Sequence, residues 1–143
     1  MYEWSPTASV PWTAKTLYRF DPSSTDGISP ASGVVLRPKG VLYRTTPAGG
    51  LHSGTSAPFG YGTICPLTPG TGSWTETILY NFDDPTDIDA YHPDAALTAD
   101  SAGNLYGASS GGHSIEGAVF ELGLPGTVEP SKFSPVPGTY NSA

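Results

Sequence analysis

The chain has 143 residues, which is enough for one domain with a core of its own. Its net charge of −7 argues against binding to a nucleic-acid phosphate backbone or to an anionic lipid surface. No apolar run approaches the roughly 20 residues that a membrane-spanning helix needs, so we expect neither nucleic acid nor membrane as a partner.

The composition predicts an all-β chain of short strands joined by tight turns. It includes 18 Gly and 15 Pro, residues that tight turns require, and 5 Phe, 3 Trp and 8 Tyr that lie among aliphatic residues in short runs. Few stretches free of Gly and Pro are long enough for a helix, and none has an apolar stripe at helical spacing. Cys65 is the only cysteine, so no disulfide can form within the chain.

The chain starts with "MYEWSPTASVPW", which has neither the basic nor the apolar region of a signal peptide. Tyr2 to Pro6 aligns with 65–69, near the end of a repeat that is described next. We therefore interpret residues 1–11 as the terminal strand of a preceding repeat. At the other end, 126–143 is rich in Pro and Gly and reads as a linker or loosely packed tail.

An internal repeat organises the rest of the chain. "WTAKTLYRFD", which starts at Trp12, recurs as "WTETILYNFD" from Trp74, and "GVLY" from Gly40 recurs as "GNLY" from Gly103. "GTICPLTP" from Gly62 aligns with "GAVFELGLP" from Gly117, so the first copy carries extra residues before this point. We assign a first repeat to 12–69, with an inserted loop at 51–61, and a second repeat to 70–125.

Each repeat has four runs that favour strands. In the second repeat the runs are 76–82, 95–99, 104–108 and 118–122, separated by turn residues. Four short antiparallel strands in a repeated unit are typical of a propeller blade. The fold prediction is therefore an all-β chain of two four-stranded, blade-like antiparallel repeats.

The repeat resembles a known family. The patterns W-T-E-T-x-L-Y-x-F, D-x-A-G-N-L-Y-G and G-x-V-F-E-L, which start at Trp74, Asp100 and Gly117, are similar to the GloVer tandem-repeat family of bacterial surface or secreted proteins. The resemblance implies propeller-like repeats and an extracellular or cell-surface location, and it brings no catalytic motif. The first repeat departs from the pattern at Arg37, Arg44 and Cys65, which replace the second repeat's Asp, Gly and Phe.

Two blades cannot close a ring, because propellers need at least four. Repeat units also bury their apolar faces only by stacking on neighbours. We therefore expect a homo-oligomer, with three chains forming a six-bladed ring as the favoured assembly. The alternative is a compact monomeric sandwich or barrel of the eight strands, which buries the same faces within one chain.

The stretch "DDPTDIDAYHPD" from Asp83 is the most acidic part of the sequence. Its closely spaced oxygen ligands suggest a Ca²⁺ site at Asp83, Asp87 and Asp89, although the spacing is not that of an EF-hand. The simpler interpretation is a solvated loop in which Asp and Pro serve the turn. Apart from Ca²⁺ in this loop, the sequence indicates no cofactor.

The same loop has the residue types of a glycosidase site. Asp83, Asp87 and Asp89 could supply two catalytic carboxyls, with Glu76 or Glu116 as other partners, because glycosidases use a pair of carboxyl groups across a cleft. His92 could relay a proton. A glycoside hydrolase is therefore the alternative to a non-catalytic function.

Aromatic residues outside the repeated positions suggest a sugar-binding surface. The leading hypothesis places polysaccharide on Phe59, Tyr61 and Tyr91, with Asp87 and Asp89 as hydrogen-bond acceptors. The chain would then be a secreted or surface β-repeat module that binds a carbohydrate or contacts a surface protein, without catalysis. A third interpretation is a purely structural repeat fragment.

Overall fold

The computed structural model describes residues 1–5, 13–21, 25–51, 59–82, 91–111, 117–123 and 134–135. The predicted all-β class is confirmed: these residues form short strands, one 3-10 turn (η1, Pro38–Gly40) and no α-helix. In chain order, the strands are β1 (Tyr2–Ser5), β2 (Thr13–Thr16), β3 (Gly27–Ile28), β4 (Val35–Leu36), β5 (Leu42–Thr46), β6 (Ala48–Gly49), β7 (Thr63–Pro69), β8 (Trp74–Glu76), β9 (Tyr80–Asn81), β10 (Thr98–Ala99), β11 (Leu105–Ser109), β12 (Ala118–Leu122) and β13 (Ser134–Pro135).

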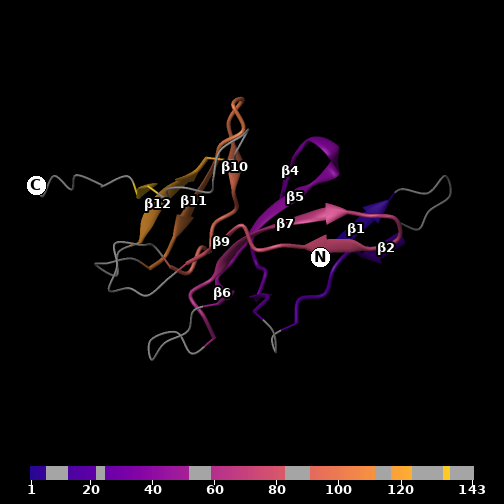
Figure 1. The fold of residues 1–143 in the computed structure, drawn as a ribbon, viewed down its shortest axis with the longest axis horizontal. Coiled ribbons are helices and arrows are strands. Elements are labelled where there is room, and N and C mark those ends of the chain that lie inside the picture. Colours follow the sequence, from indigo (N-terminus) through magenta and orange to yellow (C-terminus); the bar gives the residue numbers. More distant parts are fainter. Residues whose placement is uncertain are drawn as a thin grey trace, which may run out of the picture.

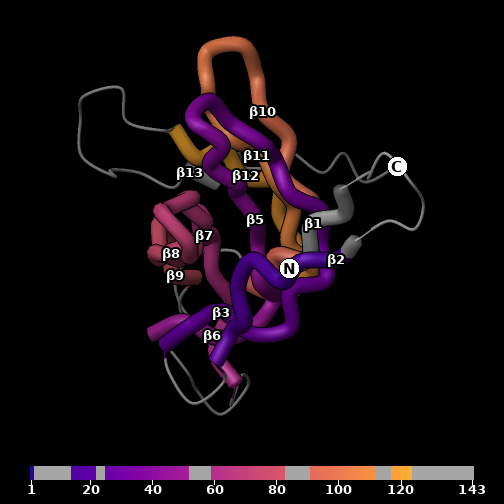
Figure 2. The backbone as a smooth tube through the Cα atoms, turned by 90° about the vertical axis from the view of Figure 1, so that its right-hand side faces the viewer, coloured from indigo at the N-terminus to yellow at the C-terminus, as the bar shows by residue number. Residues whose placement is uncertain are grey.

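Two larger sheets dominate the molecule (Figure 1). The first sheet has the order β4-β5-β7-β8, with β9 also paired to β7, and the second sheet has the order β10-β11-β12-β13. Two smaller sheets pair β1 with β2 and β3 with β6, and Figure 2 shows the β3–β6 pair at one end of the molecule. Every pairing is antiparallel, and none of the sheets built by the described residues closes into a barrel.

The sequence repeat reappears in the strand register. When two residues pair across neighbouring strands in one repeat, the residues at the same two repeat positions also pair in the other copy. The matching pairs are Val35↔Tyr43 with Thr98↔Tyr106, Leu42↔Leu67 with Leu105↔Leu122, and Trp4↔Ala14 with Leu67↔Glu76. The two repeats therefore share one strand arrangement, set by where their turns fall.

The hydrogen-bonded sheets are offset by one strand from the sequence repeats. β8 opens the second repeat, yet it pairs with β7, the last strand of the first. The connection is a tight hairpin, in which the Gly70 N–H donates to the Ser73 carbonyl at 2.9 Å, so the two strands emerge antiparallel and adjacent. The repeat boundaries at 69 and 70 thus mark the sequence period rather than the edges of a sheet.

The predicted strand 76–82 is divided into β8 and β9. Both parts pair with β7, and the Thr77 N–H still donates to the Pro66 carbonyl at 3.2 Å. Pro66 has no N–H of its own to return a bond, so the ladder is interrupted there. By contrast, the predicted strand 118–122 is observed with the same bounds.

The main core lies between the two larger sheets, which lie next to each other in Figure 1. Its buried members come from both sheets and the loops beside them: Tyr61, Ile64, Phe82, Leu97, Leu105, Phe120 and Leu122. The Phe82 and Phe120 rings meet edge to face, with centroids 5.4 Å apart. Apolar side chains of the two sheets thus share one core.

The turns between the second and third strands of each repeat meet at their tips. Gly40 and Gly103 occupy the same place in these turns, with φ of 78° and 106°, a region that favours glycine. In the second turn the Asp100 carboxylate accepts hydrogen bonds from the N–H groups of Gly103 and Asn104 at 2.6 and 2.9 Å. In the first turn Arg37 replaces that Asp, and its guanidinium reaches across to the Gly103 carbonyl at 3.3 Å.

Candidate functional site

The three loop carboxylates expected to act in metal binding or catalysis are Asp83, Asp87 and Asp89, and all three lie outside the described residues. The same is true of Glu116. Within the part of the chain that the structure describes, no group of three or more His, Cys, Asp and Glu side chains is arranged to hold a metal ion. The Ca²⁺ and carboxylate-pair assignments in this loop stay predictions.

The aromatic residues expected to bind sugar occupy different environments. Tyr61 and Tyr91 do come together, with ring centroids 5.8 Å apart at 75°, and the His92 N–H donates to the Tyr61 carbonyl at 2.9 Å. Tyr61, however, is only 2% exposed and belongs to the core, whereas Phe59 is 73% exposed. The sequence placed Tyr61 in the inserted loop but could not show that its side chain is buried, and a buried ring has no open face for a sugar.

His92 has a left-handed backbone conformation that recurs at the same place in the first repeat. Its φ is 53°, and Ser29, which takes the same place in the first repeat, has the matching φ of 58°. The strand contacts beside them also correspond, because Ile28 pairs with Ala48 as Tyr91 pairs with Gly111. The backbone geometry at His92 is therefore a property of the repeat, and it needs no catalytic explanation.

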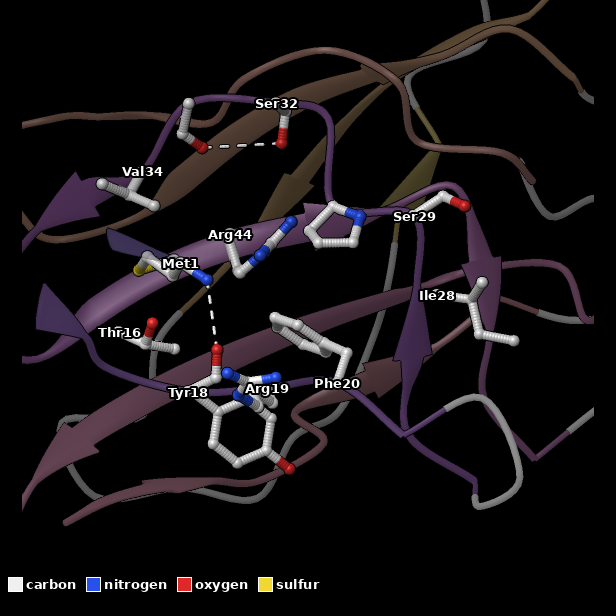
Figure 3. A pocket seen from close by; sticks show the side chains of 12 residues that line it. Met1, Thr16, Tyr18, Arg19, Phe20, Ile28, Ser29, Ser32, Val34 and Arg44 are labelled. Carbon is white, nitrogen blue, oxygen red and sulfur yellow. Dashed lines mark hydrogen bonds between the residues drawn. The ribbon is translucent and has the colours of Figure 1, made fainter. Parts of the chain in front are cut away.

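A groove of about 810 Å³ lies between the β1–β2 pair and the first sheet (Figure 3). Its lining residues include Met1, Tyr18, Phe20, Val34 and Arg44. The ammonium group of Met1 donates to the Tyr18 carbonyl at 3.1 Å, which holds Met1 beside Tyr18. None of the predicted site residues is among the described residues that line this groove, and no motif in the sequence pointed to it.

The wall of the groove corresponds to the buried core of the second repeat. Phe20 corresponds to the buried Phe82, and Val34 corresponds to Leu97. Val34 is 45% exposed, whereas Leu97 is only 6% exposed. The difference arises because the first sheet covers the second repeat, while no described residue covers the groove.

A large side chain and a small one exchange places between the repeats. Gly107 pairs with Phe120 in the second sheet, and the corresponding pair in the first sheet is Arg44 with Cys65. In each case the large member packs on the Phe that ends the repeat's first strand run. The Arg44 guanidinium lies 4.6 Å from the centroid of the Phe20 ring, a cation–π contact in place of an aromatic pair.

Two carboxyl side chains outside the groove lie close together, the buried Asp26 and the half-buried Glu76. The Tyr18 hydroxyl donates to Asp26 at 3.0 Å, and the backbone N–H of Asp21 donates to the same oxygen at 2.9 Å. Burial, together with the neighbouring Asp26 carboxyl, raises the pKa of Glu76 to about 7. Burial also raises the pKa of Cys65 to about 12, so its thiol stays protonated and unreactive.

The geometry of the acidic pair suits a structural role. The two carboxyls are close enough to share a hydrogen bond, whereas a glycosidase pair stands at least about 5 Å apart across a cleft. Neither residue lines the groove, and the Oε1 atom of Glu76 is buried without a hydrogen-bond partner. The sequence could not reveal this pair, because Asp26 and Glu76 are far apart in the chain. The one local signal was that Glu76 differs from the first repeat, which has Ala14 at the same position.

Comparison with known proteins supplies no further assignment. The chain matches no family model, and no curated protein and no solved structure matches it. Among the described residues, no helix is long and apolar enough to span a membrane. The groove and its wall are therefore interpreted from their own geometry.

Proposed function

We propose that this chain is a non-catalytic β-repeat module that acts through contacts of its sheet faces. One observation carries the proposal: positions that are buried core in the second repeat form an open groove in the first. Repeat proteins bury such faces only against a neighbour. The function supported best is therefore contact with another protein surface or with an extended polymer.

The outer face of the second sheet likewise exposes a position that is buried in the other repeat. Val119, on the outer face of the second sheet, is 60% exposed. Its counterpart in the first sheet is Ile64, which is fully buried against the second repeat. Val34 and Val119 are both exposed in the part of the chain that the structure describes, and exposed apolar faces favour association.

We extend the proposal to a propeller assembled from several copies. The proposal is supported by the two larger antiparallel sheets, which share one buried core, because consecutive blades of a propeller also pack on one another. Three chains with two such sheets each would supply six blades, which is within the size range of closed rings. The resemblance to the GloVer repeats supports this assembly and an extracellular or cell-surface location.

Polysaccharide remains the proposed ligand class alongside a surface protein. Phe59 and the neighbouring Leu51 are exposed, and the half-buried Tyr91 lies against Tyr61. Exposed aromatic faces are suited to the apolar face of a sugar ring. Because Tyr61 is buried, we propose that Phe59 and Tyr91 carry the contact.

A glycoside hydrolase is the second candidate, and one described observation favours it. Glu76 has a pKa of about 7, as a general acid working near neutrality would. Its position outside the groove and its hydrogen-bonded contact with Asp26 weigh against this role. A Glu76→Gln variant that loses a measured glycosidase activity while keeping its fold would favour the hydrolase.

The functional proposal is tested with a panel of plant and microbial polysaccharides. Depletion of protein from solution and release of reducing ends are read in the same samples, with Phe59→Ser as the binding variant and Leu36→Ser, at another exposed apolar residue, as the matched control. We expect depletion without reducing ends, weakened by Phe59→Ser alone. Sustained release of reducing ends would contradict a non-catalytic module, and no depletion would leave protein contacts as its only activity.

A further inference from the structure

We propose that the groove is a docking site for a β-hairpin of a further repeat, which adds to the edge of β1 that no described strand pairs and covers Phe20 and Val34. The proposal rests on the proposed contact function and names its partner. Addition of strands to an exposed sheet edge is a common mode of recognition, in which backbone bonds give affinity and side-chain pockets give specificity.

The chain itself contains the template for this docking. In the second repeat, the hairpin of β4 and β5 supplies part of the cover. The Thr45 hydroxyl donates to the Ala95 carbonyl at 3.0 Å, and Val35 and Tyr43 pack against the buried core. This hairpin presents an aromatic ring and a small hydroxyl side chain at alternate positions, on one face of the strand.

At the groove, half of the equivalent sheet is present. The Leu17 N–H donates to the Met1 carbonyl at 3.0 Å, just as the Leu79 N–H donates to the Ile64 carbonyl at 2.9 Å. β1 and β2 therefore occupy the places of β7 and β8 in a sheet that has no counterpart of β4 and β5 among the described residues. The hairpin that would complete this sheet is one that pairs with β1 as β5 pairs with β7.

Charge indicates which kind of hairpin fits best. Among the side chains that line the groove, Arg19 is an exposed cation and Arg44 is a buried one, and no carboxylate of the described residues lines it. The hairpin segment 95–109 contains Asp100 and no Lys or Arg, whereas 32–46 contains three cationic side chains. We therefore infer an acidic hairpin with the character of 95–109, in which Tyr106 and Ala108 would face the groove.

The test uses the whole chain and a synthetic peptide of residues 95–109. Cysteines added beyond its two ends close it as a disulfide-linked hairpin, because an isolated hairpin is only marginally stable. Binding is followed by fluorescence anisotropy of the labelled peptide. We expect saturable binding, at least tenfold weaker for the peptide with Tyr106→Ser and weaker for a closed 32–46 peptide.

Two exposed apolar residues provide a matched pair of protein variants. Val34→Asp places a carboxylate on the groove wall and should weaken peptide binding at least tenfold, whereas Leu51→Asp, outside the groove, should change it less than twofold. Circular dichroism and melting curves verify that both variants fold. Absence of saturable binding, or equal effects of the two variants, would overturn the hairpin proposal.

Failure of the hairpin proposal can be separated from failure of the proposed function. If the chain self-associates or binds polysaccharide but not the peptide, the hairpin proposal fails and the contact function stands. If the peptide binds and Val34→Asp abolishes that binding, the hairpin proposal holds whatever the result with sugars.

Discussion

The exchange of large and small residues between the repeats makes Gly107→Ala an informative substitution. A Cβ at Gly107 would lie 2.8 Å from Cε2 of Phe120, closer still to its Cζ, and 3.0 Å from Cδ2 of Leu97. Phe120 is fully buried, so its ring cannot move into solvent. The backbone at Gly107 does not have a positive φ, so the penalty is one of packing alone.

The expected magnitude follows from overpacking. One extra methyl in a filled core costs about 1–3 kcal/mol. Replacing Gly by Ala restricts the unfolded chain and returns up to about 1 kcal/mol. We therefore expect Gly107→Ala to lower the free energy of unfolding by about 1–2 kcal/mol, measured by urea denaturation.

Gly33→Ala is the matched control. Its Cβ would meet only the Cβ of Ala96, at 3.5 Å, which is ordinary van der Waals contact. The double variant Gly107→Ala with Phe120→Leu should be more stable than the sum of the single effects predicts, because the shorter side chain makes room for the methyl. Equal stability of Gly107→Ala and Gly33→Ala, or strict additivity in the double variant, would refute this account of the packing.

Three further predictions concern single side chains. The pKa of Glu76 is about 7 in the folded chain against an ordinary 4.5. Between these two pH values the folded chain holds a proton that the unfolded chain releases. The stability that this proton contributes is complete below about pH 4.5 and is lost as the pH rises to about 7. Urea midpoints at about pH 5 and about pH 8 should therefore differ less in Glu76→Gln than in the wild type, and an unchanged difference would contradict this assignment. Asp100→Ala should lower the melting temperature, because the second turn loses the acceptor for Gly103 and Asn104, and calorimetry with the exposed Ser101→Ala as control measures it. The buried Cys65 should react with a thiol reagent only when the chain unfolds, and rapid labelling of the native chain would argue against its burial.

Much of the fold follows from local sequence. The turn at 100–104 is set by Asp, Gly and Asn, which favour that geometry wherever they occur. The strand 118–122 has the alternation of a half-buried strand and is observed as expected. The repeat itself predicts equivalent pairing, because identical spacing of turns imposes identical register.

The site depends on contacts between distant segments, which the sequence does not specify. Tyr61 belongs to the core, and its ring packs against that of Tyr91, which lies in the other repeat. Asp26 and Glu76 meet only after β3 and β8 have joined different sheets. Arg44 and Cys65 looked like departures from the repeat pattern, yet their cross-strand pairing makes them a single exchange of volume.

Light scattering coupled to size exclusion tests the central claim, that the faces left uncovered at the two ends of the chain drive association. Measured over micromolar concentrations, the mass should be a whole multiple of the 14.8 kDa of one chain, with three copies favoured. Val34→Asp, in the groove, should reduce that mass. A wild-type mass of 14.8 kDa throughout would contradict the assembly and show that the chain buries no further surface against its own copies.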